Sequence, residues 1–426
     1  VGMNTADTIM VGPLGATALA AVGIGSAIHS FGVIVCVGIL LGMTPLVSQA
    51  FGAGDRAQCR RVLVQGVWLA LLLSVPLGVL NWTGGDAARL LGQDVGVTTL
   101  TGAYLRALVW GIVPYLLFMA VRDYLEGMGD VRAPMIITFL GLGLNIVANR
   151  VFIYGIEGWV PAMGVVGTGW ATTTVRWAML LGILFYVLRR TDLHPLRGVS
   201  ARVEPALLRT IARIGSPIGA HFGLEVGLFA FAAVMIGWIG PVELAAHQIT
   251  INIAATTFMV ALGVSMAGSI RVGQRIGEHR PRAMRRAALA TYLLAAGFMS
   301  LCALGFIAAP GTLIRLYTPD AAIITLGSKL LLVAAAFQVF DGAQVAGGSV
   351  LRGAAETRSP MVIAGIGYWL VGFPLGYVLG FPLGLGPVGV WIGLSAGLAV
   401  AAVLLAARVR SMLWRGPFSR LRVGGM

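Results

Sequence analysis

Three acidic residues, Asp7, Glu225 and Asp341, stand inside otherwise apolar stretches of this 426-residue chain. The surrounding segments read ADTIMVG, FGLEVGLFAF and FQVFDGAQV. A carboxyl group in such a place binds a cation or takes up a proton, because an isolated charge away from water is costly. Its charge then depends on occupancy, as a transporter needs in order to couple an ion gradient to substrate movement. The alternative is a structural carboxyl that a neighbouring hydroxyl or amide satisfies.

Aromatic and amide side chains accompany one of these acids. Phe337 and Gln338 precede Asp341 by four and three residues, on the same helical face, and Gln344 follows it by three. An acid beside an aromatic ring and amides suits a lipophilic cation through charge pairing and ring contact. Packing against lipid or core is the alternative for the ring.

Other amides lie within apolar stretches too. Asn145 and Asn149 are four residues apart and share a helical face, and Asn252 is a weaker case of the same kind. The pair could hold Asp7 or a cation, or could make ordinary hydrogen bonds between helices. Arg150, next to Asn149, either reaches toward the membrane surface or pairs with an acid.

The composition identifies the solvent around these residues. The chain is 58% hydrophobic and 11% charged, with a mean hydropathy of +0.89. A soluble domain has about 25% charged residues, so a soluble enzyme, a disordered protein and a nucleic-acid-binding domain are all excluded. The bilayer is the expected environment.

Apolar runs recur along the chain, and most reach the ~20 residues that a membrane-spanning helix needs. They predict an all-α membrane protein of twelve transmembrane helices, the first one truncated. The runs lie near 1–12, 22–48, 62–82, 101–121, 133–155, 164–188, 207–238, 244–270, 286–308, 325–350, 360–380 and 386–407.

The two halves of the chain repeat each other. With a shift of 225 residues, Gln49 falls on Gln274 and Gly52 on Gly277; with 226, residues 125–135 fall on 351–361. We therefore expect two pseudo-symmetric six-helix bundles. The N-terminal lobe is residues 1–195, the cytoplasmic linker is 196–204 and the C-terminal lobe is 205–426. The linker lies within the longest polar stretch, 189–213, which contains six arginines. The same shift predicts that about 20 residues are missing before Val1.

Arginine placement predicts the orientation in the membrane. The net charge is +14, and 24 of the 30 basic residues fall in alternate loops and the C-terminal tail, against 2 in the opposite loops. The positive-inside rule then places both termini in the cytoplasm.

Two sequence patterns resemble enzyme motifs but lack the flanking structure that those motifs need. GLSAG at 393–397 lies inside an apolar run rather than on a strand-to-helix turn, and GLGPVG at 384–389 follows no strand. His29, His221 and His247 show no metal-ligand spacing. We expect no enzyme activity, no cofactor and no ATP site.

Taken together, several segments resemble the multidrug and toxic compound extrusion (MATE) transporters, in particular the NorM branch. They are ADTIMVG, LNIVANRVFIYG, FGLEVGLFAF, LAAHQITIN, IRVGQRIG and FQVFDGAQV followed by LRGAAETRSPM. The resemblance spans essentially the whole chain. It implies two lobes around a central cavity and alternating access in the bacterial inner membrane. It also implies export of lipophilic cationic compounds in exchange for Na⁺ or H⁺.

The resemblance also assigns roles to residues. Glu225 and Asp341 correspond to the coupling acids of the C-terminal lobe, where Na⁺ could bind. Asp7, Asn145 and Asn149 correspond to the polar site of the N-terminal lobe. Phe337 stands where relatives often have Tyr, and Arg150 where an aromatic residue is more usual.

The expected partners are therefore membrane lipids and small lipophilic cations, with no nucleic acid, and the chain is expected to be a monomer. A flippase of a lipid-linked precursor is the alternative function. Such a protein would need cationic residues in its cavity to hold a pyrophosphate, whereas the candidate residues here are acidic.

Overall fold

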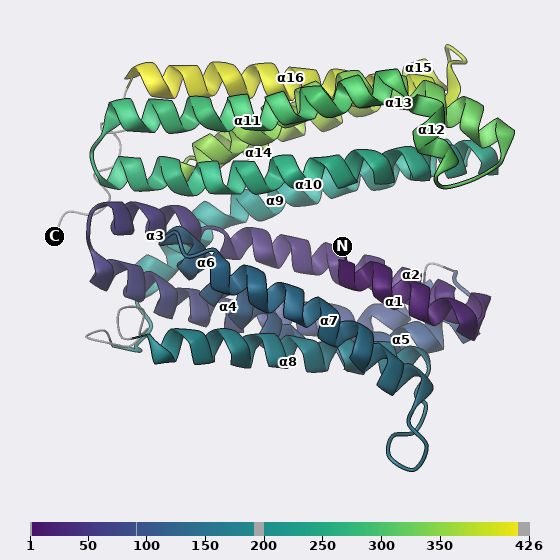
Figure 1. The fold of residues 1–426 in the computed structure, drawn as a ribbon, viewed down its shortest axis with the longest axis horizontal. Coiled ribbons are helices and arrows are strands. Elements are labelled where there is room, and N and C mark those ends of the chain that lie inside the picture. Colours follow the sequence, from purple (N-terminus) through teal and green to yellow (C-terminus); the bar gives the residue numbers. More distant parts are fainter. Residues whose placement is uncertain (1, 91, 191–199, 416–426) are drawn as a thin grey trace. The chain divides into compact units, whose positions relative to one another are not determined.

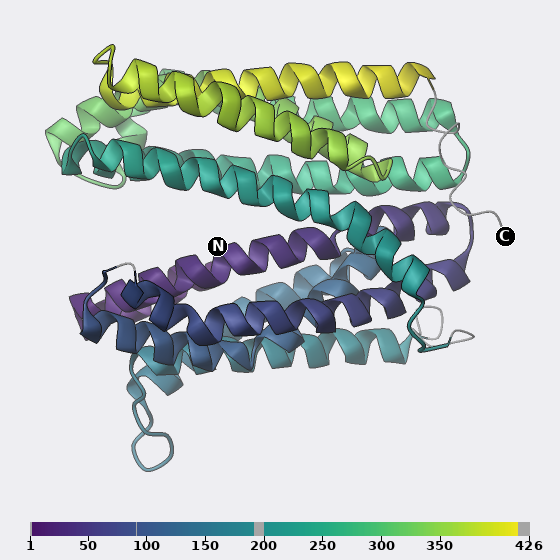
Figure 2. The same cartoon turned by 180° about the vertical axis from the view of Figure 1, so that it is seen from behind.

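The computed structural model describes residues 2–90, 92–190 and 200–415, and these residues are helical apart from turns, short loops and one bridge pair between Ile156 and Val160. Figures 1 and 2 show the helices from two opposite sides. Ten of them are long and apolar enough to cross a membrane, and an eleventh span is formed if the pair Val95–Val109 and Ile112–Gly127, bent by 49°, is counted as one. The all-α membrane fold predicted from the sequence is confirmed.

The chain divides into two compact units, one comprising residues 1–47 and 55–219 and the other residues 48–54 and 220–426. The predicted lobe boundaries at 195 and 205 stay a prediction. Residues 196–199 of the predicted linker and the tail 416–426 lie outside the described residues.

Residues 2–90 and 92–190 form eight α-helices and one short 3₁₀ helix. They are α1 (Gly2–Val11), η1 (Gly12–Leu14), α2 (Ala16–Leu40), α3 (Met43–Gly52), α4 (Arg56–Leu90), α5 (Val95–Val109), α6 (Ile112–Gly127), α7 (Arg132–Tyr154) and α8 (Val165–Arg189). Helix α5 packs on α2, α4 and α8, and α7 packs on α1 and α8. These contacts bring α1, α7 and α8 together.

The second half contains the elements α9 (Pro205–Gly237), α10 (Pro241–Gly277), α11 (Pro281–Ala308), α12 (Pro310–Arg315), α13 (Ala321–Gly353), α14 (Arg358–Ala364), the π-helical segment η2 (Gly365–Gly372), α15 (Phe373–Gly380) and α16 (Gly386–Arg415). Helix α13 packs on α10, α11 and α16, and α15 packs on α16. This pattern repeats the packing of α5 and α6 on α2, α4 and α8, and of α7 on α8. The predicted internal symmetry is therefore visible in the helix contacts.

Apolar side chains face outward as well as inward. Phe139, Leu181 and Leu293 are each more than 60% exposed. In a soluble protein such an outer surface would be unfavourable, whereas hydrocarbon tails cover it at no cost.

Two glycines that the sequence repeat pairs make reciprocal contacts in the second unit. A Cβ atom at Gly52 would lie 2.0 Å from the Gln274 carbonyl oxygen, and one at Gly277 would lie 2.0 Å from that of Gln49. Only glycine permits backbones to approach so closely. The repeat of Gln49 and Gly52 at Gln274 and Gly277 thus has a structural reason.

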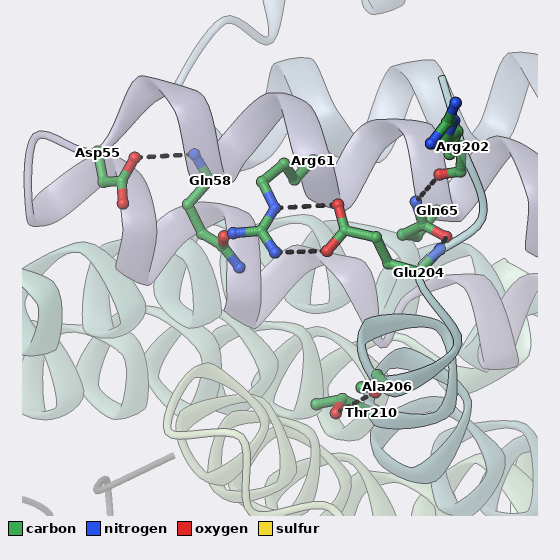
Figure 3. Close-up of polar contacts among 8 residues, drawn as sticks. All are labelled: Asp55, Gln58, Arg61, Gln65, Arg202, Glu204, Ala206 and Thr210. Atoms are coloured by element: carbon green, nitrogen blue, oxygen red, sulfur yellow. Dashed lines mark hydrogen bonds and ion pairs between the residues drawn. The ribbon is translucent and has the colours of Figure 1, made fainter. Parts of the chain in front are cut away.

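The segment before α9 is fastened to α4, as Figure 3 shows. Arg61 donates two hydrogen bonds to the carboxylate of Glu204. The side chain of Gln65 donates to the Arg202 carbonyl at 2.9 Å and accepts from the Glu204 backbone N–H at 2.9 Å. Arg61 lowers the pKa of Glu204 because its guanidinium stabilises the carboxylate.

Candidate functional site

Asp7 lies at a junction of three helices in the first unit. Its side chain on α1 is 3% exposed. Asn149 on α7 donates from Nδ2 to Asp7 Oδ1 at 2.6 Å, and Thr172 on α8 donates from Oγ1 to Asp7 Oδ2 at 3.2 Å. Neutral donors thus satisfy both oxygens of the carboxyl group.

The two predicted amides are brought to Asp7, as their spacing suggested. Asn149 Nδ2 also lies 3.4 Å from Asn145 Oδ1, and both residues are fully buried. With its nitrogen so used, Asn149 Oδ1 has no hydrogen-bond partner among the described residues, and neither has the Thr168 hydroxyl one turn before Thr172. Buried oxygens of this kind are available to a cation or a water molecule.

A second buried polar chain in this unit was not predicted. Asn81 donates to the Leu77 carbonyl at 2.7 Å, which turns its Oδ1 toward His29 Nδ1 at 2.8 Å. Because Asn81 Oδ1 can only accept, His29 carries its proton on Nδ1. His29 Nε2 is then the acceptor for Arg176 Nη2 at 2.8 Å.

This series of hydrogen bonds holds the Arg176 side chain beside the three-helix junction that contains Asp7. Arg176 follows Thr172 by one turn of α8, and its guanidinium lies over the Tyr115 ring at 4.7 Å. Asp7 and Arg176 interact electrostatically. The first unit therefore contains a positive charge beside Asp7 that the sequence analysis did not single out.

The position of Arg150 has a simple explanation. Its side chain is exposed near the end of α7, and its guanidinium lies over the Tyr154 ring at 5.0 Å. Residues four apart on a helix are neighbours, so this is a cation–π contact along one face. Of the two predicted alternatives, the contact favours the snorkelling arginine.

The second unit brings Asp341 on α13 and Glu225 on α9 within electrostatic range of each other. Asp341 is 5% exposed and Glu225 is half-buried. Two like charges in one region repel each other, and of the two acids it is Glu225 that also interacts electrostatically with a cationic side chain, that of Arg352. The structure thus groups the two acids that the sequence separates by 116 residues.

Tyr368 is the residue of this region that sequence reasoning missed. It lies in the π-helical segment η2, is 1% exposed, accepts a hydrogen bond from Gln344 Nε2, and interacts electrostatically with both acids. π-helical turns are rare and often found at functional sites. With its oxygen accepting from Gln344, the phenol has its own hydrogen left to donate.

The remaining predicted residues have different surroundings. Phe337 is buried with its ring 5.7 Å from that of Trp391 and 6.2 Å from that of Phe229, so it belongs to the core. Gln338 donates to the Thr257 hydroxyl, and its buried Oε1 has no partner among the described residues. Asn252 is exposed and accepts from the Tyr317 hydroxyl at 3.0 Å. Its role in cation binding stays a prediction.

The donor set suits exchangeable light ions. The described residues hold no group of three or more His, Cys, Asp or Glu side chains that could bind a metal ion. Carboxylates, amide carbonyls and hydroxyls are hard oxygen ligands, which Na⁺ or a proton can occupy and leave.

Comparisons of the sequence and of the fold with known proteins agree on one family. The MatE family model matches residues 1–151 and 217–378. The chain is 38% identical to the "Probable multidrug resistance protein NorM" of Bradyrhizobium diazoefficiens over 422 aligned residues. The alignment covers 97% of this chain and 90% of that protein.

Solved structures share the fold. A MATE protein crystallised in the bent conformation has a TM-score of 0.89 at 24% identity, covering 98% of this chain and 92% of its own. The eukaryotic MATE transporter AtDTX14 has a TM-score of 0.86 at 20% identity, covering 98% and 94%. With more than half of its residues matched by the family model, the chain belongs to the MatE family of membrane transporters.

Proposed function

We propose that this transporter is a multidrug antiporter, which exports lipophilic cationic compounds in exchange for Na⁺ or H⁺ by alternating access. The name of its relative from Bradyrhizobium diazoefficiens supports multidrug resistance as the biological role. The buried acids Asp7 and Asp341 support cationic cargo.

The observation that carries the proposal is the burial of carboxyl groups in both units. Asp7 is 3% exposed and Asp341 is 5% exposed, inside segments long and apolar enough to span a bilayer or directly adjoining them. An ionisable residue at that depth is expensive and is kept for a function. A carboxyl is the one such group that attracts both a coupling cation and a cationic drug.

The exchange follows from competition for the same acids. A drug cation at Asp341 and Glu225 balances their charge, and an entering Na⁺ or proton does the same, so the two occupants exclude each other. The gradient of the ion then drives release of the drug. In the first unit, Asn149 and Thr172 satisfy Asp7 while no cation is bound, which lets that carboxyl be emptied and refilled.

We further propose that the transporter works as a single chain in the inner membrane. The arginine distribution supports cytoplasmic termini. The two acids of the second unit, Glu225 and Asp341, favour drug cations over the pyrophosphate of a lipid-linked precursor.

Efflux of a fluorescent cationic dye from cells tests which acids carry the function. We expect Glu225→Gln and Asp341→Asn each to lower the efflux rate at least tenfold at equal expression. Glu157→Gln, a matched removal of an exposed loop carboxylate, should leave the rate unchanged. Full efflux by both the Glu225 and Asp341 variants would rule out the proposed mechanism.

A further inference from the structure

A cavity of about 560 Å³ lies between α10 and α11, at the end where α10 finishes and α11 begins. One face of each helix lines it. On α10 the lining residues follow the helical repeat from Val264 to Arg275, and on α11 they run from Ala283 to Leu294. The walls are mainly alanine, glycine and aliphatic side chains, and arginines occupy one end.

Three arginines line this end: Arg271 and Arg275 on α10, and Arg286 on α11. Arg275 is paired with Glu278 at 2.7 Å. Arg271 makes one hydrogen bond, to the neutral Gln274 side chain at 3.4 Å. Across the part of the chain that the structure covers, neither Arg271 nor Arg286 has an acidic partner within ion-pair distance. The cavity therefore keeps two uncompensated positive charges from opposite walls.

The apolar part of the cavity continues along the helices away from these charges. From Arg275 to Val264, α10 rises through eleven residues, or about 16 Å. That length is close to one leaflet of a bilayer core of about 30 Å. Small side chains such as Ala267 and Ala290 keep this stretch open.

We propose that this groove binds one anionic phospholipid. The phosphate lies between Arg271 and Arg286, and an acyl chain follows the small residues toward Val264 and Leu294. Two guanidinium groups from facing helices match a phosphate, for which arginine is the preferred partner. Basic pockets between transmembrane helices on the cytoplasmic side are typical sites for anionic headgroups, and the arginine bias puts this end at that side. A free phosphate shares the headgroup chemistry but leaves the apolar length of the groove empty.

Native mass spectrometry of the whole chain in neutral detergent tests the assignment. The probes are phosphatidylglycerol, phosphatidylcholine with the same acyl chains, and inorganic phosphate. We expect the wild type to retain one phosphatidylglycerol in preference to phosphatidylcholine. Arg271→Gln with Arg286→Gln should weaken its retention on the order of tenfold to thirtyfold.

Two further variants separate the groove from general charge and from folding. Arg282→Gln with Arg410→Gln removes the same charge from exposed positions outside the groove and should change retention less than twofold. Ala290→Trp fills the groove without changing any charge and should also release the lipid. Dye efflux by each variant reports separately whether it is folded.

The proposal would be overturned by equal retention of the two phospholipids, by equal loss in the two arginine double variants, or by full retention in Ala290→Trp. Displacement of phosphatidylglycerol by inorganic phosphate at comparable concentration would assign the site to a free anion instead of a lipid.

Discussion

The hydrogen bond between Asp7 and Asn149 should show the strongest energetic coupling of the junction formed by α1, α7 and α8. The donor–acceptor distance is 2.6 Å, and the carboxyl is buried. Hydrogen bonds to charged groups contribute about 1.5–3 kcal/mol in soluble proteins. Double-mutant cycles in membrane helices average about 0.6 kcal/mol and reach about 1.7 kcal/mol. We therefore expect about 1.5 kcal/mol for this pair.

The assay is a double-mutant cycle with Asp7→Ala, Asn149→Ala and both together. The free energy of unfolding is measured by tryptophan fluorescence during denaturation from mild detergent. Thr172→Val, paired with Asp7→Ala, should give a smaller coupling of about 0.6 kcal/mol, because its hydrogen bond is 3.2 Å long. Thr168→Val is the matched control, since its hydroxyl has no partner in the described structure.

The geometry would be refuted if Asp7 and Asn149 were additive within about 0.4 kcal/mol, which is the scatter expected of independent sites. A larger coupling of Asp7 with Thr168 than with Thr172 would show that α8 is shifted along its axis by about one turn relative to Asp7.

Three other expectations follow from named contacts. Asn81→Leu removes the acceptor for His29 Nδ1, so ¹⁵N chemical shifts of His29 should show an Nδ1-protonated ring in the wild type and a mixture of tautomers in the variant. Glu204 has a lowered pKa, so its pair with Arg61 stabilises the fold fully above the unfolded-state pKa of about 4.3, and this effect is lost as the pH falls from there through the lower folded-state pKa. Because the pair is partly exposed, Glu204→Gln should remove at most about 1 kcal/mol near pH 7 and flatten the acid limb of a pH–stability curve. Gly52→Val forces a Cβ into contact with a backbone oxygen and should cost about 1–3 kcal/mol, whereas Gly263→Val, which faces open space, should be near neutral in thermal unfolding.

Much of the fold could be predicted because its signals are local. Long apolar runs specify the spans, and the repeat of Gln49 and Gly52 at Gln274 and Gly277 specifies the symmetry without any tertiary information. The grouping of Asp7 with Asn145 and Asn149 was also accessible, since two amides one turn apart within an apolar helix need a polar neighbour.

The residues that sequence reasoning missed are brought together by contacts between segments that are distant in the sequence. His29 meets Asn81 across 52 residues and Arg176 across 147, and no spacing rule connects such positions. Tyr368 lies within electrostatic range of the acids, in a π-helical segment that a 3.6-residue period does not describe. Phe337 has both interpretations that the sequence offered still open to test: it lies one turn from Asp341, and its ring packs in the core, so its contact with a cation stays a prediction.

Transport in proteoliposomes under an imposed ion gradient tests the central claim most directly. Purified protein is reconstituted, a fluorescent lipophilic cation is loaded, and a Na⁺ gradient or a pH gradient is applied separately. Ion-coupled antiport predicts that one of the two ion gradients drives the dye against the dye's own concentration gradient. It also predicts that Asp341→Asn abolishes this movement. Coupling through the buried acids is contradicted if neither gradient drives transport. It is also contradicted if the Asp341→Asn variant moves the dye against its concentration gradient as the wild type does.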